Sequence, residues 1–369
     1  MKNLKFINFN PRKKTTETIY LFGERVSGTI GRTILVCVLV MLFFYTMPVL
    51  ISYVDDEILV KEYENNSRKL MVYKLDGKSN IDDEELDVND IFDEKDLLSD
   101  ILTLNDLEND SVRLSAITIE QLFKDTKYNL DDVRKNKLVK PVALTWLPYE
   151  IKKIQNTKKR KELFLQIVLP LALEENNKIK LDRLKLFNII GKDSNTELEK
   201  KWLNKKYKQY GVTTKDLSTL KARMDEIPTS LILAQAAKET GWGTSRFALE
   251  GNALFGQWTW SGEGLKPKDA DASTGHKVMK FNILQASVRA YQRNLNTHRS
   301  YKEFRKARSK LRAEGKELDS IFLSKHLDMY AETGKKYVEI LQQIIEQNNL
   351  KDFDDAKLLP SSRKLETLI

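Results

Sequence analysis

The sequence predicts a mostly α-helical protein of the α+β class, with one small β unit in the C-terminal third of the chain. Apolar residues recur at spacings of three and four over most of the chain after residue 116, as they do in amphipathic helices. The stretch 258–260 alternates instead, and a second strand-like run follows at 277–281. With 369 residues, the chain is long enough for two domains, and its 15 Gly and 8 Pro exclude a collagen-like or low-complexity protein.

The cysteine and histidine contents argue against a metal site. A single cysteine, Cys37, excludes an intramolecular disulfide and a cysteine-based zinc cluster. The three histidines, at positions 276, 298 and 326, lack the spacing of helical metal ligands. We therefore expect no metal and no organic cofactor.

An apolar run near the N-terminus predicts a transmembrane helix. Residues 34–51 carry no charge, and the run extends to residue 54 before the acidic triplet 55–57. At 1.5 Å per residue, a helix of this length spans the hydrocarbon layer of about 30 Å. A cleavable signal peptide is the alternative, but its basic region would be unusually long and no A-x-A-like site follows.

The charges that flank this run predict its orientation. Residues 1–54 contain seven Lys and Arg against two Glu, a net charge of +5. Because Lys and Arg are retained on the cytoplasmic side, we expect residues 1–54 to form a cytoplasmic basic tail and a single-pass anchor. The bulk of the chain would then lie across the membrane.

A strongly acidic segment follows the anchor, between residues 55 and 115. Residues 55–110 contain 19 Asp and Glu against six Lys and Arg, a net charge of −13. The pattern fits either a small subdomain with a strand and a helix or a solvated acidic spacer. In both cases this segment is a candidate surface for protein partners.

Residues 116–226 are predicted to form a helical lead-in. Apolar positions recur at helical spacing on both sides of Pro170, and the same period continues to Ile189. Gly191 is a plausible end for this stretch, and a further helical stretch ends near Gly211. The apolar stripes are most simply explained as a core.

The best-defined helix is predicted between Pro228 and Gly241, because proline is tolerated in the first turn and glycine ends a helix. Two short strands with a long polar loop between them follow, and helical stripes return at 288–295 and 337–345. We expect residues 227–350 to form the domain that contains the candidate catalytic residues, and residues 351–369 to form a polar tail.

Glu239 is the candidate general acid. It lies in the last turn of this helix, after an apolar run and before Gly241-Trp242-Gly243. Burial against the Trp242 indole and the negative end of the helix dipole both disfavour the carboxylate, and so raise its pKa. A raised pKa suits an acid that works near neutral pH. The alternative is an ordinary surface glutamate near a helix end.

The residues around Glu239 resemble the bacterial Bax-like proteins, which belong to glycoside hydrolase family 73. The run LILAQAAKETGWGTSRFALEGNALFGQW, residues 231–258, carries the resemblance through Trp242-Gly243, Asn252 and Phe255-Gly256 at their spacing. The likeness extends through residues 281–305 and 327–341, and it reaches upstream into residues 163–183.

This resemblance implies an endo-β-N-acetylglucosaminidase with a lysozyme-like, α-rich fold. Its substrate would be the glycan strand of peptidoglycan, cut at the β-1,4 bond after N-acetylglucosamine. The resemblance assigns the general acid to Glu239 and an active-site tyrosine to Tyr330. The sugar would bind between the helical lobe and a hairpin made of the two predicted strands.

Glycoside hydrolysis normally needs a second carboxylate. Related glucosaminidases often place it on the hairpin, where this chain has Lys277. The candidates that remain are Glu263, Asp269 and Asp271 on the intervening loop, and Glu332. Without such a carboxylate, the N-acetyl group of the substrate or Tyr330 would share the work.

Five aromatic or amide side chains are candidates for binding sugar: Trp242, Asn252, Phe255, Trp258 and Trp260. Trp258 and Trp260 share one face of a strand, where they would stack on sugar rings or pack on the helical lobe. Trp242 and Phe255 are more simply explained as core residues. Asn252 would either fix a turn or bind an acetamido group.

The charge of the exported part bears on its partners. Residues 111–369 carry a net charge of +17, but export and the lack of a nucleic-acid motif argue against a nucleic-acid partner. Peptidoglycan and anionic envelope surfaces are simpler counterparts. We expect a peptidoglycan hydrolase anchored in the bacterial inner membrane through residues 33–54, with its bulk in the periplasm. The alternative is a non-catalytic peptidoglycan-binding or scaffold protein that retains a lysozyme-like cleft.

Overall fold

The computed structural model describes residues 19–21, 24–26, 98–101, 103, 112–259, 264–266 and 277–360. The chain forms two compact units, residues 1–77 and 78–369. In the first unit, strands β1 (Ile19–Leu21) and β2 (Glu24–Val26) pair in antiparallel fashion. The predicted anchor at residues 33–54 lies outside the described residues. None of the helices that the structure describes combines the length and the apolar character needed to cross a membrane.

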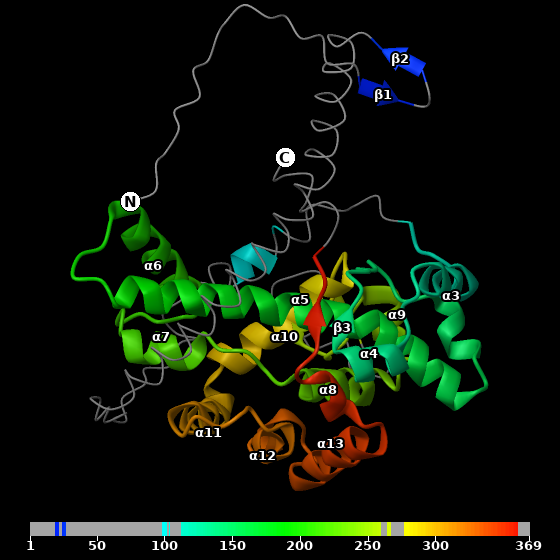
Figure 1. Cartoon of the computed structure of the whole chain (residues 1–369). Coiled ribbons are helices and arrows are strands. Elements are labelled where there is room, and N and C mark those ends of the chain that lie inside the picture. Colours follow the sequence, from blue (N-terminus) through cyan, green and yellow to red (C-terminus); the bar gives the residue numbers. More distant parts are fainter. Residues whose placement is uncertain are drawn as a thin grey trace, which may run out of the picture. The chain divides into compact units, whose positions relative to one another are not determined.

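The second unit is mostly α-helical, as predicted (Figure 1). Its helices are α3 (Ala116–Asp125), α4 (Leu130–Asn136), α5 (Thr157–Ile190), α6 (Glu197–Gln209), α7 (Leu217–Arg223), α8 (Thr229–Thr240), α9 (Arg246–Gly251), α10 (Leu284–Thr297), α11 (Lys302–Ala313), α12 (Ser320–Ser324) and α13 (Lys335–Gln347). Short 3₁₀ turns occupy Tyr149–Lys153, Arg299–Tyr301, Asp328–Tyr330 and Leu350–Phe353. The strands of this unit are β3 (Leu138–Val139), β4 (Trp258–Thr259), β5 (Gly264–Leu265), β6 (Lys277–Met279) and β7 (Lys357–Leu358).

Helix α5 continues through Pro170 instead of ending there. Proline lacks the N–H that would bond to the carbonyl four residues earlier, which belongs to Gln166. The Tyr128 hydroxyl donates to that carbonyl at 3.1 Å, and the Gln166 side-chain amide donates to the Tyr128 carbonyl at 3.0 Å. A side chain from outside the helix thus replaces the missing hydrogen bond, and α5 runs on to Gly191, its predicted end.

Helix α8 lies in the centre of the main core. It packs against α5, α13 and the turn at 350–353, and nearly all of its side chains are buried. The first half of α5 contributes the facing apolar side chains, as its stripe predicts. A second, smaller core lies between the end of α5, α6 and α7, around Leu186, Tyr207 and Leu220. The apolar burial around α8 holds the end of this helix, where Glu239 lies, in a fixed place.

A buried ion cluster fixes the start of α8. The Asp225 carboxylate, 3% exposed, lies 3.0 Å from Arg312, 3.7 Å from Arg183 and 3.9 Å from Arg308. Burial opposes the charge of Asp225, but Arg183, Arg312 and Arg308 together hold its pKa below the usual range. Since these arginines belong to α5 and α11, the cluster ties the segment before α8 to both helices.

The small β unit has three strands, not the two predicted. Strand β6 lies between β4 and β5 and pairs with both in antiparallel fashion, with Val278 opposite Trp258 on one side and Leu265 on the other. Strand β5 falls in the segment predicted to be a loop. Its two residues are too few for an alternating pattern, so only the register with β6 reveals it.

Residues 98–101, from the acidic segment, pack within the second unit. Residues 98–101 are helical, and Ile101, 1% exposed, packs with Phe281 and Ile283 and with α10. The Asp100 carboxylate lies 3.1 Å from Arg293, also on α10. At its end, the segment predicted as a spacer or subdomain is therefore part of the fold.

The last described strand returns to the lead-in. Strands β3 and β7 pair in parallel, with Leu138 opposite Lys357 and Val139 opposite Leu358. The Leu359 N–H extends this ladder to the Val139 carbonyl at 2.9 Å. The first ten residues of the predicted polar tail thus belong to the fold.

Candidate active site

Glu239 lies half-buried in the last turn of α8, and the helix ends at Gly241, which has a left-handed φ of 58°. The Tyr337 hydroxyl of α13 donates to Glu239 Oε1 at 2.9 Å. Burial raises the pKa of Glu239, whereas the hydrogen bond from Tyr337 and the charge of Lys238 lower it, and the outcome is a raised pKa. The direction agrees with the prediction for a general acid.

The hydrogen-bond partner of Glu239 comes from a helix that is distant in the sequence. The Trp242 ring packs edge-on against Phe164 of α5, with ring centroids 6.0 Å apart, and Lys161 lies over it at 4.6 Å. Trp242 therefore packs against the core. The aromatic residue whose hydroxyl donates to Glu239 is Tyr337. Sequence reasoning placed Tyr337 only in the apolar stripe of a helix, because its 98-residue distance from Glu239 leaves no local pattern.

The predicted tyrosine, Tyr330, stands beside this pair. Its ring stacks on Tyr337 with centroids 5.4 Å apart and planes at 10°, and its hydroxyl donates to the Phe255 carbonyl at 3.0 Å. Burial raises the pKa of Tyr330 well above its ordinary value of 10, so the hydroxyl is neutral at physiological pH. The structure therefore brings Tyr330 and Glu239 together through Tyr337.

Gly256 lies next to the second carboxyl oxygen of Glu239. Its φ is 64°, and a Cβ built on it would lie 3.9 Å from Oε2. No residue that the structure describes donates a hydrogen bond to Oε2. One oxygen of the carboxyl group is thus held by Tyr337, and the other is left free for a partner that is not part of the described chain.

Two of the predicted sugar-binding residues, Asn252 and Phe255, are buried and make contacts within the fold. Asn252 is fully buried with a left-handed φ of 51°, and its side-chain amide donates to the Phe281 carbonyl at 3.2 Å. Phe255 is 2% exposed and stacks on Tyr291 with ring centroids 4.0 Å apart. Asn252 therefore fixes the turn after α9, and Phe255 belongs to the main core.

The remaining predicted residues lie outside what the structure describes. These are Trp260, Glu263, Asp269 and Asp271, and the side chain of Trp258. Glu332 is exposed, and strand β6, Lys277 to Met279, has no acidic residue. Among the described residues, no group of three or more His, Cys, Asp or Glu side chains could hold a metal ion.

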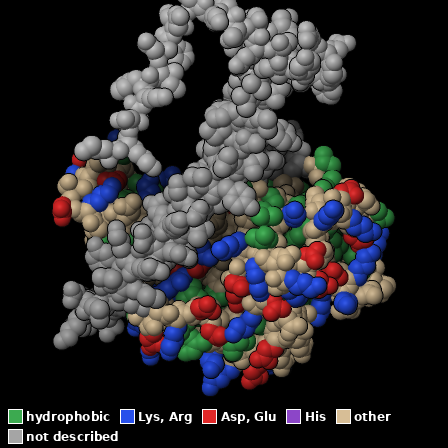
Figure 2. Space-filling model, in the orientation of Figure 1, with side chains coloured by type: hydrophobic (Ala, Val, Ile, Leu, Met, Phe, Trp, Pro, Cys, Tyr) green, Lys and Arg blue, Asp and Glu red, His purple; other side chains and the backbone are tan. Residues whose placement is uncertain are grey.

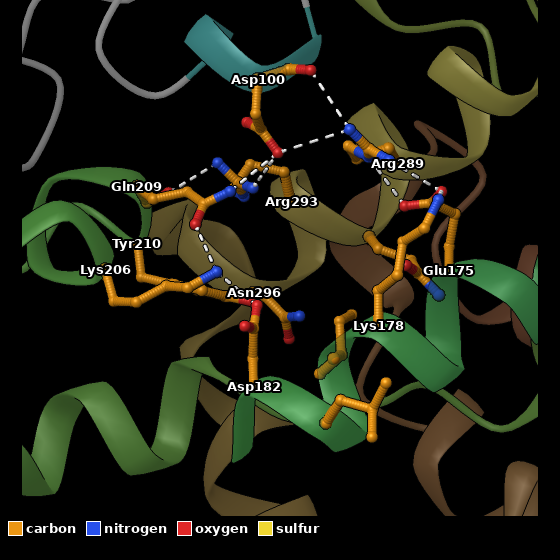
Figure 3. Close-up of a pocket in the computed structure, with 13 residues that line it drawn as sticks. Asp100, Glu175, Lys178, Asp182, Lys206, Gln209, Tyr210, Arg289, Arg293 and Asn296 are labelled. Atoms are coloured by element: carbon orange, nitrogen blue, oxygen red, sulfur yellow. Dashed lines mark hydrogen bonds and ion pairs between the residues drawn. The ribbon is translucent and has the colours of Figure 1, made fainter. Parts of the chain in front are cut away.

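The second unit also contains a polar cavity of about 320 Å³ between α5, α6 and α10 (Figure 3). The charged groups in its lining are paired: Arg289 with Glu175 at 2.8 Å, Arg293 with Asp100 at 3.1 Å, and Lys206 with Asp182. Glu239 and its tyrosines do not line it. We interpret this cavity as part of the ionic packing between the helices and place the candidate active site at Glu239.

The comparison with known proteins points to the same region. The family model described as mannosyl-glycoprotein endo-beta-N-acetylglucosaminidase matches residues 215–350, which include Glu239, Tyr330 and Tyr337. Protein bax of Escherichia coli (strain K12) is 33% identical over 206 residues, which cover 54% of this chain and 73% of that protein. No solved structure matches the chain. The chain therefore belongs to the glucosaminidase family of glycoside hydrolases, among its Bax-like members.

Proposed function

We propose that the chain is a peptidoglycan hydrolase, an endo-β-N-acetylglucosaminidase that cuts glycan strands at the β-1,4 bond after N-acetylglucosamine. A lysozyme-like helical domain would present Glu239 as the general acid. The observation that carries the proposal is the state of Glu239: a half-buried carboxyl group with a raised pKa, one oxygen that accepts from Tyr337, and a second oxygen to which no described residue donates. It lies inside the region that matches the glucosaminidase family.

The chemistry follows from these groups. Protonated Glu239 would give its proton to the glycosidic oxygen while the bond from that oxygen to C1 breaks. A water molecule would then add to C1, and the proton that it loses would return through solvent to the Glu239 carboxylate, which restores the acid and leaves a new reducing end on N-acetylglucosamine. The raised pKa keeps the acid protonated to a higher pH, and Tyr337 stabilises the carboxylate that forms.

A second group must stabilise the positive charge that develops at C1. Glu263 is our candidate for a carboxylate in this role, with the acetamido group of the substrate or Tyr330 as the alternatives. The hydroxyl proton of Tyr330 already bonds to the Phe255 carbonyl. Tyr330 would therefore assist through its oxygen, and Trp258 and Trp260 would hold the sugar rings.

We also propose that residues 33–54 anchor the chain in the inner membrane, with the catalytic domain in the periplasm. The uncharged run and the change from basic to acidic residues across it support this placement. Figure 2 shows acidic and basic side chains interspersed over α11–α13, an arrangement unlike the basic stripe of a nucleic-acid interface. We keep the acidic segment as a candidate surface for envelope proteins.

Digestion of purified sacculi by the full chain, with the new ends identified by mass spectrometry, tests the function. Reducing N-acetylglucosamine ends are expected. Anhydro-muramyl ends would indicate a lytic transglycosylase, and intact strands that retain the bound protein would favour the non-catalytic binder.

Glu239→Gln tests the assignment of the acid. We expect cleavage to fall at least about 100-fold, while binding to sacculi persists, because Gln cannot donate the proton. Glu250→Gln is the matched control, since Glu250 is exposed on α9 and its partner among the described residues is Arg246 at 3.2 Å. Equal cleavage by Glu239→Gln and the wild type would refute the assignment.

A further inference from the structure

We infer that a directional hydrogen-bond chain, from Tyr291 through Gln235 to Tyr337, fixes the transferable proton of Glu239 on Oε2. Gln235 and the two tyrosines are then positioning residues for proton donation. This inference rests on the proposed function of Glu239.

The chain joins three helices of the core. The Tyr291 hydroxyl of α10 donates to Gln235 Oε1 at 2.5 Å, and Gln235 Nε2 donates to the Tyr337 hydroxyl of α13 at 3.0 Å. Tyr337 in turn donates to Glu239 Oε1 at 2.9 Å. Gln235 and Tyr291 are fully buried, and Tyr337 is 1% exposed. Because an amide in such a place is costly without partners, the arrangement of Gln235 is tightly specified.

The direction of this chain follows from counting hydrogens. Each tyrosine hydroxyl has one hydrogen to donate. The Gln235 carbonyl accepts the hydrogen bond from the Tyr291 hydroxyl, so the Gln235 amide nitrogen faces Tyr337. The Tyr337 oxygen then accepts a hydrogen bond from Gln235, and the Tyr337 hydroxyl donates its own hydrogen bond to Glu239.

The opposite orientation of Gln235 is disfavoured. If the amide turned over, its N–H would face Tyr291, and the Tyr291 hydrogen would lose the acceptor that the described structure gives it. A buried donor without an acceptor carries a desolvation penalty. Tyr337 would then donate to Gln235, and Glu239 Oε1 would lose its donor.

The direction decides where the acidic proton lies. Oε1 accepts from Tyr337, so in the neutral acid Oε1 is the carbonyl oxygen and the proton is on Oε2. Oε2 is the oxygen next to Gly256 that no described donor reaches. In the proposed reaction the Oε2–H bond breaks and its proton forms an O–H bond with the leaving oxygen, which keeps the electron pair of its bond to C1. Water supplies the hydroxyl group that ends on C1.

The pKa shifts of Tyr337 and Glu239 are consistent with this direction of the hydrogen-bond chain. Burial raises the pKa of Tyr337 far above its ordinary value, so Tyr337 remains a donor over the working pH range. Its hydrogen bond lowers the pKa of Glu239 against the effect of burial. Tyr337 therefore holds the acid in one orientation and also stabilises the carboxylate left behind.

The test compares Tyr291→Phe, Tyr337→Phe and the double variant in the full chain, with kcat and KM measured against pH on glycan strands. In each single variant we expect kcat to fall about tenfold at unchanged KM, the effect of losing one hydrogen bond to a charged group. The basic limb of the profile should move to higher pH, because the Glu239 carboxylate loses a donor. The double variant should match Tyr337→Phe, since Tyr291 acts only through Gln235 and Tyr337.

Tyr128→Phe is the control, because it removes a core hydroxyl that bonds to Gln166 and does not touch Glu239. The basic limb of its pH profile should lie at the same pH as that of the wild type. Losses that multiply in the double variant, or an unmoved basic limb in Tyr337→Phe, would overturn the inference.

A wild-type chain that releases no N-acetylglucosamine ends would refute the proposed function but would still leave the hydrogen-bond chain open to measurement. Carbon-13 NMR of labelled Glu, with Glu239→Gln to identify the signal, follows the titration of Glu239 directly. Tyr291→Phe and Tyr337→Phe should both raise the pKa of Glu239. A pKa equal to that of the wild type in both variants would overturn the inference without any activity.

Discussion

At Glu239, two opposing effects set the properties of one carboxyl group. Desolvation favours the neutral acid, and the hydrogen bond from Tyr337 favours the carboxylate. The raised pKa shows that desolvation outweighs the hydrogen bond and the charge of Lys238. An acid that is too strong would be ionised at working pH, and one that is too weak would hold its proton, so the balance suits proton donation.

The raised pKa of Glu239 predicts a pH dependence of stability. A group with a raised pKa binds its proton more tightly in the folded state, so the stability of the wild type falls as the pH rises from about 4.5 through the folded pKa. Glu239→Gln lacks this titration. As the pH rises, the free energy of unfolding of Glu239→Gln should therefore increase relative to that of the wild type, by about 1.4 kcal/mol for each unit by which the pKa is raised.

Urea unfolding of both proteins at pH 4 to pH 8 measures this difference. Glu250→Gln, at an exposed position, is the matched control for the loss of one carboxylate. A difference between Glu239→Gln and the wild type that is constant with pH would show that Glu239 titrates normally in the folded chain.

The sequence predicts the raised pKa of Glu239 but not the residues that hydrogen-bond to it. A charged residue at the end of an apolar helix, followed by Gly241-Trp242-Gly243, is a local pattern and is visible in one segment. The partners Tyr337 and Tyr291 come from other helices, where their spacing matches that of ordinary core residues. Trp242, the local candidate, packs on Phe164. Contacts between distant elements depend on packing angles that no local pattern encodes.

At the scale of elements, helix α5 shows how a local rule is overridden. A proline in a helix interior removes one hydrogen bond and commonly kinks or ends the helix. Here the Tyr128 hydroxyl satisfies the carbonyl of Gln166 that Pro170 leaves free, and the helix keeps all 34 residues. The limits of α8 at Pro228 and Gly241, by contrast, follow from the sequence because proline and glycine act within a single turn.

A double-mutant cycle tests the role of Tyr128. Tyr128→Phe should lower the free energy of unfolding by about 1 to 2 kcal/mol, because it leaves the Gln166 carbonyl without a donor. In a Pro170→Ala background the cost should be much smaller, since the alanine N–H can bond to Gln166 within the helix. Thermal or urea unfolding of the four proteins gives the coupling energy, and equal costs in the two backgrounds would contradict this role.

At the scale of the whole molecule, the second unit extends further toward the N-terminus than the family match. The match begins at residue 215, yet Ile101 is buried and Asp100 bonds to Arg293 and, at 2.7 Å, to Gln209. Composition alone could not reveal this contact, because Asp100 lies in a segment with a net charge of −13 that is typical of a solvated spacer.

This packing predicts different stabilities for two truncated forms. Residues 112–369 should unfold at a lower temperature than residues 78–369, with a loss of about 2 to 4 kcal/mol, because the apolar site of Ile101 becomes exposed and Arg293 loses a carboxylate. Ile101→Ala in the longer form should reproduce part of the loss. Equal unfolding midpoints for the two forms would show that the contact contributes nothing.

The parallel ladder between β3 and β7 has a consequence for biosynthesis. Strand β3 is synthesised more than 200 residues before β7. Its edge therefore remains unpaired until nearly all of the intervening helices have been translated. Pairing across so long a loop is slow, and an unmatched edge invites association with other nascent chains. A chaperone that shields this stretch until β7 is made would relieve that hazard, and translation paused before codon 357 should leave β3 open to proteases.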